Sequence, residues 1–386
     1  MREVAVIGIG QTEISEHWDR SLRELAGDAV LRAMADAGLD YFDGLYVGNM
    51  MSVSANNQQH LGAYIADWVG QRGKEAFHLE SACCSGAAAF RSALIAVASG
   101  DIDVAVAVGV EKMTDSPSTE ITASLATAAD ADWEVSQGLS FVALNALIMQ
   151  RYLHEYGWKR SDFANFSINA HANAMHNPYA RFHMLLTEKQ FEEAGVICDP
   201  ITLLDASPIG DGAAAALLVP VEKLNSLPER PIIRIAGSGA ASDTIAAHAR
   251  KDPLWLTAAE KSSIDAYEQA GIKPKDIDFF EYHDAFTIMA ALSLEASGFA
   301  ERGQGPRLAL ENNITRTGRI PVATLGGLKA RGHPVGATGL YQIVEVVTQL
   351  RGNAGDSQID GARWGMAQNI GGSGSNIITH ILTNAS

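Results

Sequence analysis

A cysteine pair is the feature of this chain best placed to do nucleophilic chemistry. Cys83 and Cys84 stand in segment 80–89, where a strand signal turns into a helix of small residues. A thiol at a helix N-terminus faces backbone N–H groups and a partial positive charge, which favour the thiolate. That dipole contributes roughly 0.3–1 kcal/mol, so a base elsewhere in the chain is also required. As isolated residues, both cysteines could equally be small core side chains.

Two histidines are candidates for that base. His283 follows a strand signal in segment 281–286, and His333 lies at a helix start in segment 332–339, Gly-His-Pro-Val-Gly-Ala-Thr-Gly. In a duplicated fold, the helix after His333 is the counterpart of the helix after Cys83, so the two helix N-termini can approach each other. A Cys/His pair of this kind suits nucleophilic catalysis. The alternative for each histidine is a hydrogen-bonded core residue.

The duplication is visible in the order of the expected elements. A strand, a helix and a second strand occur early in the chain and recur with the same spacing later. Their ranges are 3–9, 21–37 and 43–48, then 231–236, 257–270 and 276–281. Each half then continues with a small-residue helix start and a glycine-rich approach to an apolar strand. A duplicated α/β unit explains this pattern.

We therefore expect a duplicated five-layer α-β-α-β-α fold with an inserted loop domain. The N-terminal half spans 1–112 and 206–225, and the C-terminal half spans 226–386. Residues 113–205 have no counterpart in the second half, and we expect them to cover the active-site face. The helices expected in this insertion lie near 140–156 and 161–176.

Bulk properties argue against several classes of protein. The chain has no run of 18 apolar residues and no basic-then-apolar start, so we expect neither a membrane span nor a secretory signal. Three cysteines without a CxxC pair argue against disulfides and a structural zinc site, and fit a reducing cytoplasm. A net charge of −16 speaks against nucleic acid as a partner.

Four motifs together resemble the thiolase superfamily over essentially the whole chain. They are Cys-Cys-Ser-Gly at 83–86, His-Asp-Ala-Phe at 283–286, Gly-His-Pro-Val-Gly-Ala-Thr-Gly at 332–339 and Asn-Ile-Gly-Gly-Ser-Gly at 369–374. The CxSG pattern of the family assigns Cys83 as the nucleophile and leaves Cys84 for packing. Ordinary thiolases carry Asn-Glu-Ala-Phe at the second motif, so the chain is similar to the sterol-carrier-protein-type and archaeal-type branch.

The resemblance implies an acyltransferase that forms or cleaves 3-ketoacyl-CoA. Cys83 would attack an acyl-CoA thioester to form an acyl-enzyme, with His333 promoting the thiolate. His333 and His283 would stabilise the thioester oxyanion of the second substrate. The backbone N–H groups of Cys83 and Gly371 would form the other oxyanion hole, where one donor is worth about 2.7–4 kcal/mol. Coenzyme A is expected as a substrate, with no metal and no nicotinamide.

One position departs from the family pattern. Ordinary thiolases have a second cysteine, the acid/base of the carbon–carbon bond chemistry, where this chain has Asn369. The sterol-carrier-protein-type enzymes can use a cysteine in a His-Asp-Cys-Phe motif, but here that residue is Ala285. By elimination, His283 is the hypothesised base for the α-proton of the second acyl-CoA.

Three residues are weaker candidates for contacts with coenzyme A. Ser238, in Gly-Ser-Gly after a strand, falls where thiolases place a pantetheine-contacting serine, although it could equally be a plain turn. Arg250 and Lys251 could meet the CoA phosphates, or could simply be a solvated surface. A partial dinucleotide fingerprint near the N-terminus lacks its third glycine, because Glu13 stands there.

Other functions of the same fold remain open. One alternative is a subunit of a larger complex that transfers acyl groups to a non-CoA acceptor or performs retro-aldol cleavage. Another is a catalytically silent scaffold. The presence of Cys83 with both histidines favours acyl transfer, because that reaction needs a covalent thioester. The resemblance also implies a homodimer or homotetramer, with a hydroxymethylglutaryl-CoA synthase and a small OB-fold accessory protein as candidate partners.

Overall fold

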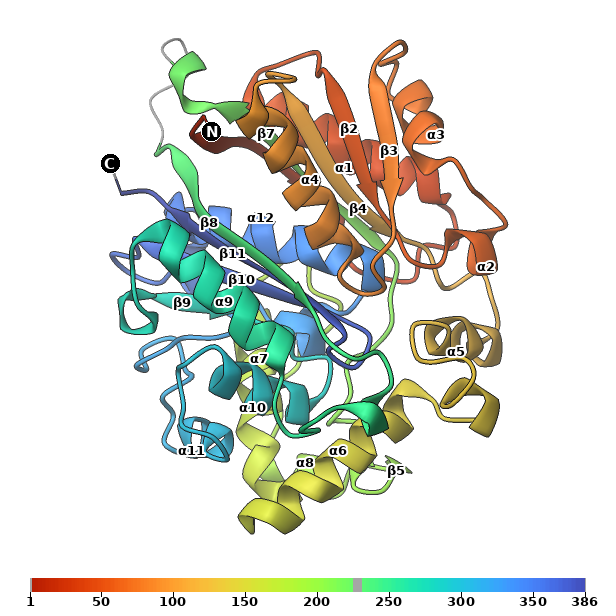
Figure 1. Cartoon of the computed structure of the whole chain (residues 1–386), viewed down its shortest axis with the longest axis vertical. Helices are drawn as coiled ribbons and strands as arrows, with labels where there is room; N and C mark the ends of the chain where they lie inside the picture. Colours follow the sequence, from red (N-terminus) through yellow and green to blue (C-terminus); the bar gives the residue numbers. More distant parts are fainter. Residues whose placement is uncertain (1, 225–230, 386) are drawn as a thin grey trace.

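The computed structural model describes residues 2–224 and 231–385. Within these residues, nine strands form one sheet in the order β3-β2-β4-β7-β1-β8-β11-β10-β9. The strands are β1 (Val4–Gln11), β2 (Gly44–Gly48), β3 (Glu75–Leu79), β4 (Ala105–Glu111), β7 (Gly212–Pro220), β8 (Ile233–Ser242), β9 (Phe279–Glu281), β10 (Trp364–Gly371) and β11 (Asn376–Thr383). The N-terminal strands lie at the upper right of Figure 1, and the C-terminal strands lie to their left.

The two parts of this sheet repeat one topology. In the order β2-β4-β7-β1 the first pair is parallel and the next two are antiparallel. In the order β9-β10-β11-β8 the same pairings recur. The parts meet through β1 and β8 over two residue pairs, Ala5 with Arg234 and Val6 with Ile233. The duplication expected from the sequence is therefore confirmed in the strand pairing.

Helices form the remaining layers of the fold. They are α1 (Leu22–Ala37), α3 (Leu61–Trp68), α4 (Ser85–Ser99), α9 (Thr257–Ala270) and α12 (Thr338–Leu350). Helices α4 and α12 pack against each other and against strands of both halves, whereas α1 and α3 cover the outer face of the N-terminal strands. Helix α9 covers the outer face of β8 and β11. The helices and strands therefore form the predicted α-β-α-β-α layers, with α4 and α12 in the central layer.

Local sequence signals explain the outer helices. Ser21 and Glu24 form a capping box at the start of α1, and Gly38 ends it in the left-handed conformation, at φ 69°. Glycines in the facing strands let each helix approach closely. A Cβ on Gly8 would come 2.1 Å from the Ala33 carbonyl oxygen of α1. The N-terminal glycines of the partial dinucleotide fingerprint therefore serve helix–strand packing.

The inserted segment forms the lower part of Figure 1. The two expected helices are present as α6 (Phe141–Tyr156) and α7 (Ala164–Ala174). The segment also contains α5 (Ser118–Ala126), α8 (Glu188–Glu192) and the hairpin of β5 (Val196–Cys198) and β6 (Ile201–Thr202). Its apolar residues share a core cluster with α10 (Thr287–Ala296) of the C-terminal half. The expected domain boundary at 225/226 lies outside the described residues.

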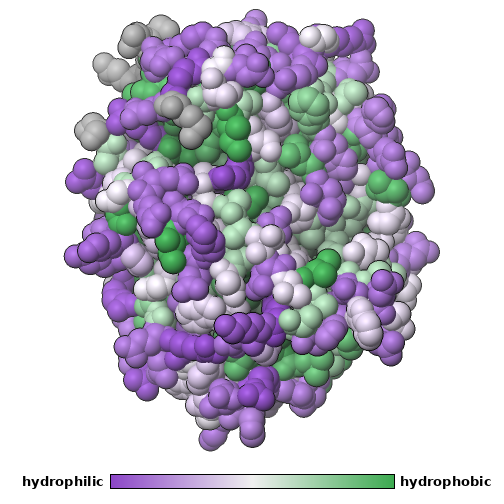
Figure 2. All heavy atoms as spheres, viewed as in Figure 1, coloured by the Kyte–Doolittle hydropathy of each residue, from purple (hydrophilic) through white to green (hydrophobic). Residues whose placement is uncertain are grey.

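The segment Ala82–Ser99 is, within the described chain, the one helix long and apolar enough by composition to cross a membrane. In the fold, 61% of it is buried, because it forms α4 between the two sets of strands. The face in Figure 2 is mainly hydrophilic, with hydrophobic residues in small groups among the polar ones.

Candidate active site

Cys83 lies in a tight turn between β3 and α4. Ala82 has a left-handed backbone, φ 51°, which is strained for a residue other than glycine. Ser85 holds the turn, because its Oγ accepts from the Ser81 N–H at 2.8 Å and donates to the Ala82 carbonyl at 2.6 Å. Cys83 is partly exposed, whereas Cys84 is fully buried and its Sγ donates to the Asn369 carbonyl at 3.2 Å. The strained turn thus presents Cys83.

The thiol of Cys83 is neutral in the resting site. Burial, followed by the Glu111 carboxylate, raises its pKa to about 12, although the backbone N–H groups of Cys83 and Gly372 act in the opposite direction. Cys83 also packs against an apolar cluster, Met51, Met113, Ile121 and Val335. A base must therefore take the proton from the thiol, because burial outweighs the backbone N–H groups.

Glu111 is a site residue that the sequence reasoning missed. It is fully buried at the end of β4, and burial raises its pKa to about 7. Its carboxylate accepts from Asn49 Nδ2 at 2.8 Å and from the backbone N–H groups of Met51, Met50 and Gly336 at 3.0, 3.1 and 2.9 Å. It therefore ties β4 to the loop that carries His333. In the sequence, the signal for this residue was an acidic side chain at the end of an otherwise apolar strand.

The two helix starts meet without intervening side chains. A Cβ on Gly86 of α4 would come 2.8 Å from the Gly336 carbonyl oxygen. A Cβ on Gly339 of α12 would come 2.4 Å from the Ala87 backbone nitrogen. These contacts explain the small residues in both motifs and place Cys83 beside the His333 loop, as the duplication predicts.

His333 is held by its own loop. A π-helical turn, Gly327–Arg331, precedes it, and its Nδ1 lies 2.7 Å from the Thr338 hydroxyl at the start of α12. Burial, then the neighbouring His283 and Arg331, lower its pKa well below the ordinary value. The imidazole is therefore neutral in the resting site.

His283 lies next to His333, with ring centroids 5.1 Å apart and the rings nearly perpendicular at 88°. Its Nδ1 is 3.0 Å from the amide nitrogen of Asn369 on β10. Burial and the Arg331 charge lower the pKa of His283 to about 3. The residue at the position of the missing second cysteine is therefore in direct contact with the second histidine.

Buried charges stand behind the histidines. Arg331 Nη1 pairs with Glu345 Oε2 at 2.6 Å, and both side chains are fully buried. Burial, followed by the charge of Glu345, raises the pKa of Glu281 to about 8. Burial lowers the pKa of Lys329 to about 8 and raises that of Asp284. The sequence reasoning assigned no role to these residues.

Two family models match the chain. The model described as "Thiolase, N-terminal domain" matches residues 4–222, and "Thiolase C-terminal domain-like" matches residues 239–384. The chain belongs to the thiolase family. This confirms both the resemblance and the fold class.

Individual proteins agree with the family match. An acetyl-CoA acetyltransferase of Methanothermobacter thermautotrophicus is 44% identical and covers 99% of this chain and 100% of the relative. Sterol carrier protein 2 of Bos taurus is 30% identical over 97% of this chain and 71% of the relative. The solved structure "Ltp2-ChsH2(DUF35) aldolase" is 26% identical, with a TM-score of 0.85 over 99% of this chain and 97% of that one. The archaeal and sterol-carrier-protein branch is confirmed.

In this thiolase, a backbone N–H of the turn after β10 lies near the Cys83 thiol. The N–H that faces the thiol belongs to Gly372. Gly371 is still part of β10, where it pairs with Asn376. Gly371 stays the predicted partner of Cys83 in the oxyanion hole, and the neighbouring Gly372 N–H faces the sulfur.

The three residues expected to contact coenzyme A differ in their burial and in their partners. Ser238 is buried in mid-strand, and its Oγ accepts from Arg91 at 2.6 Å, so its hydroxyl serves the packing of α4 on β8. Arg250 is also buried, and its Nη1 donates to the Ser373 carbonyl at 2.6 Å, in the turn that contains Gly372. Only Lys251, of these three predicted contacts, is an exposed base.

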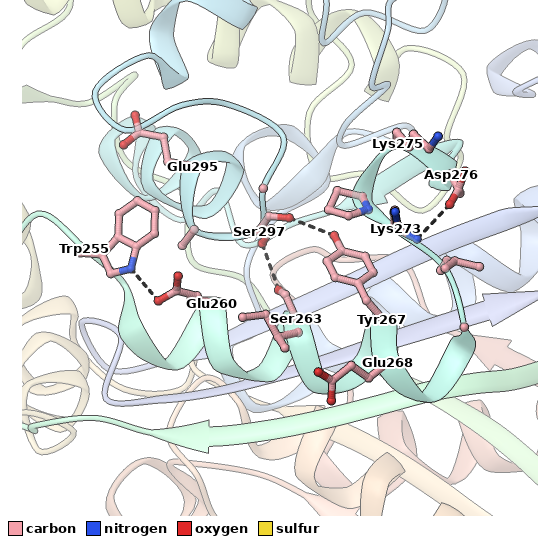
Figure 3. Close-up of a pocket in the computed structure, with 16 residues that line it drawn as sticks. Trp255, Glu260, Ser263, Tyr267, Glu268, Lys273, Lys275, Asp276, Glu295 and Ser297 are labelled. Atoms are coloured by element: carbon pink, nitrogen blue, oxygen red, sulfur yellow. Dashed lines mark hydrogen bonds between the residues drawn. The ribbon is translucent and has the colours of Figure 1, made fainter.

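Neither a metal-binding group nor the pocket of Figure 3 adds residues to the catalytic site in the described part of the chain. In the part of the chain that the structure describes, no group of three or more His, Cys, Asp or Glu could hold a metal ion. The pocket of Figure 3 lies between α9 and the end of α10, and its side chains bond to one another, as Trp255 Nε1 does to Glu260 at 2.9 Å. It contains none of the predicted catalytic residues.

Proposed function

We propose that this thiolase is an acetyl-CoA C-acyltransferase, which forms or cleaves 3-ketoacyl-CoA through an acyl group carried on Cys83. One observation carries the proposal. Cys83 stands in a strained turn with two backbone N–H groups directed at its sulfur, beside a loop that presents a neutral histidine. Those groups suit formation of a thioester and stabilisation of its oxyanion.

In the first half-reaction, His333 Nε2 takes the proton of Cys83 as the sulfur attacks the thioester carbonyl carbon. We assign the developing oxyanion to the N–H groups of Cys83 and Gly371, the two donors that the resemblance to thiolases implies. The bond to the CoA sulfur then breaks, and the leaving thiolate takes the proton from His333. Because the resting thiol and imidazole are both neutral, the proton moves only as the attack proceeds.

The second half-reaction builds the carbon–carbon bond. A base removes an α-proton from the second acyl-CoA, and the resulting carbanion attacks the acyl carbonyl on Cys83. The carbon–sulfur bond breaks and the Cys83 thiolate leaves, taking up the abstracted proton. Asn369 has no group that can accept a proton, so we assign the base to an imidazole.

Cleavage of acetoacetyl-CoA by free CoA tests this function. We expect thiolysis by the wild type and its loss in Cys83→Ala and His333→Gln. The alternative is retro-aldol cleavage, since the solved neighbour at a TM-score of 0.85 is named an aldolase. A branched 3-hydroxyacyl-CoA supplied in parallel separates the two. Cleavage of that substrate alone, unaffected by Cys83→Ala, would contradict the proposal.

The proposal also covers the oligomeric state, the partner proteins and the cellular location. β3 is an edge strand of the sheet, with Phe77 53% exposed, so pairing of two β3 strands would make a homodimer. The named DUF35 component of the solved neighbour supports a small accessory partner. A homotetramer and a hydroxymethylglutaryl-CoA synthase partner remain predictions. Free cysteines at 83, 84 and 198 support the proposed cytoplasmic location. The proposed acyl-CoA chemistry would place the enzyme in lipid metabolism.

Light scattering of the purified chain tests the dimer. A charged residue in the edge, Phe77→Glu, should shift the mass toward the monomer. An unchanged mass in this variant would contradict pairing through β3.

A further inference from the structure

Asn369 links the nucleophile helix to the second histidine. Its backbone carbonyl accepts from the buried Cys84 thiol at 3.2 Å, next to the nucleophile. Its side-chain amide nitrogen lies 3.0 Å from His283 Nδ1. The side chain is 98% buried, so this contact is shielded from water. An asparagine that cannot carry a proton is thus placed to control a group that can.

The amide oxygen of Asn369 lies near the glycine at the start of α12. That oxygen lies 2.6 Å from the point where a Cβ on Gly339 would stand, and the backbone nitrogen of Ala87 lies 2.4 Å from the same point. Ala87 belongs to the first turn of α4, where the helix dipole is positive. Asn369 Oδ1 is buried and has no hydrogen-bond partner among the described residues. The amide nitrogen is the end that faces His283, at 3.0 Å from Nδ1.

This orientation determines where the imidazole carries its proton. An amide nitrogen can donate a hydrogen bond but cannot accept one, so His283 Nδ1 must be the acceptor. In a neutral ring the proton then resides on Nε2. Burial and Arg331 keep the ring neutral, since they lower its pKa to about 3.

We propose that Asn369 is a positioning residue that holds His283 as an Nε2–H donor, directed at the thioester oxygen of the second acyl-CoA. The inference rests on the proposed function for the identity of that oxygen. It replaces the hypothesis, drawn from the sequence, that His283 is the base. The base is then His333, because its Nδ1 partner is the Thr338 hydroxyl, which can accept Nδ1–H and leave Nε2 free.

The tautomer can be measured in the resting enzyme without any substrate. Full-length protein labelled with ¹⁵N-histidine is examined by long-range ¹H–¹⁵N correlation, and His283→Gln assigns the signal. We expect the Nε2–H pattern for His283 in the wild type at neutral pH. An Nδ1–H pattern would overturn the proposal. Because no turnover is involved, this outcome is independent of whether the enzyme is an acetyltransferase.

Kinetics of Asn369→Asp test the consequence for the reaction. A carboxylate would accept from Nδ1–H and raise the pKa of His283, so Nε2 would lose its role as a neutral donor. We expect thiolysis to fall on the order of 100-fold, the usual effect of one lost oxyanion donor. Acetylation of Cys83 by acetyl-CoA should change by less than about threefold, because that half-reaction uses other donors.

Asn145→Asp is the matched control. Asn145 is a buried asparagine of α6 that makes one hydrogen bond from its amide nitrogen, to the Phe141 carbonyl at 2.9 Å. Its change should leave both rates near wild type. Equal losses of acetylation and thiolysis in Asn369→Asp, or full thiolysis, would overturn the proposal. Failure of the wild type to become acetylated would instead contradict the proposed function and leave the tautomer result standing.

Discussion

The two sides of the catalytic site are built from equivalent elements but have opposite surroundings. On the nucleophile side, Cys83 is enclosed by apolar side chains and backbone N–H groups, with the carboxylate of Glu111 next to them. On the histidine side, His283 and His333 stand in front of buried charges that include Arg331 and Glu345. The thiol is kept neutral by burial and the nearby carboxylate, whereas the imidazoles are kept neutral by burial and a neighbouring cation.

The comparison teaches how a duplicated unit can acquire two chemical roles. The β-α frame and the glycine contacts between α4 and α12 are shared, so both helix starts reach the same place. The chemistry differs because side chains at a few equivalent positions differ. Backbone dipoles do not titrate, so the nucleophile side needs few charges. The histidine side requires paired ions, which are costly when one partner is removed.

The largest effect should come from breaking the nucleophile side. Cys83→Ala should lower acyl transfer by at least about four orders of magnitude, as expected when a covalent nucleophile is lost. Cys84→Ala is the control, because that thiol only packs and donates to Asn369, and it should retain activity with a stability loss of about 1 kcal/mol. Initial rates of thiolysis and chemical denaturation measure the two effects. Comparable activity losses would contradict the assignment.

The histidine side should be the more fragile in stability. Arg331→Met leaves Glu345 buried without its ion pair, so the free energy of unfolding should fall by about 3–5 kcal/mol. The exposed pair of Arg151 and Glu155 provides a control, since Arg151→Met should cost less than about 1 kcal/mol. Urea unfolding measures both. A loss below 1 kcal/mol for Arg331→Met would contradict the prediction that the buried ion pair stabilises the folded protein.

Glu111 connects the two sides, and Glu111→Gln should separate its two effects. The glutamine amide would face backbone N–H groups, such as that of Gly336, where the carboxylate accepts, so stability should fall by about 1–3 kcal/mol. Removal of the negative charge should also lower the pKa of Cys83 below its value of about 12. The pH profile of Cys83 alkylation should therefore move to lower pH. A profile that moves upward would contradict the electrostatic account.

The smallest effect concerns a buried histidine outside the site. His380 packs against Phe90 of α4 at 4.8 Å between ring centroids, and burial lowers its pKa to about 3. Between about pH 6.5 and 3 the unfolded chain binds a proton that the folded chain does not, so stability falls as pH falls, by about 1.4 kcal/mol per pH unit. His380→Leu should remove that contribution. Thermal unfolding of both proteins at pH 7 and 5 measures it, and parallel slopes would contradict it.

Much of the fold could be predicted from local signals. Caps and periodicity placed α1 and α9 almost at their observed ends, and the apolar runs placed β1, β7 and β11. The strand β10 was not predicted, because Gln368 and Asn369 interrupt its apolar pattern. The amide nitrogen of each is bonded to distant partners, as Gln368 Nε2 is to the Ser263 hydroxyl at 3.0 Å. Tertiary hydrogen bonds of this kind leave no local trace.

The site was predicted unevenly for the same reason. The motifs identified Cys83, His283 and His333, and the duplication predicted that the helix starts meet. The Gly-Ser-Gly around Ser238 serves helix packing, because a Cβ on Gly239 would come 2.0 Å from the Ser262 carbonyl oxygen, and a contact of Ser238 with coenzyme A stays a prediction. Arg250 was expected at the surface, but it is buried against the turn after β10. Burial of a charged side chain depends on partners that the sequence does not place.

Intact-mass spectrometry after incubation with acetyl-CoA shows whether Cys83 carries the acyl group. We expect one acetyl group on the wild type, located at Cys83 by peptide mapping, and none on Cys83→Ala, with Cys84→Ala modified like the wild type. An unmodified wild type, or an acetyl group on Cys84 or Cys198, would contradict the assignment of Cys83 as the nucleophile of a covalent acyl transfer.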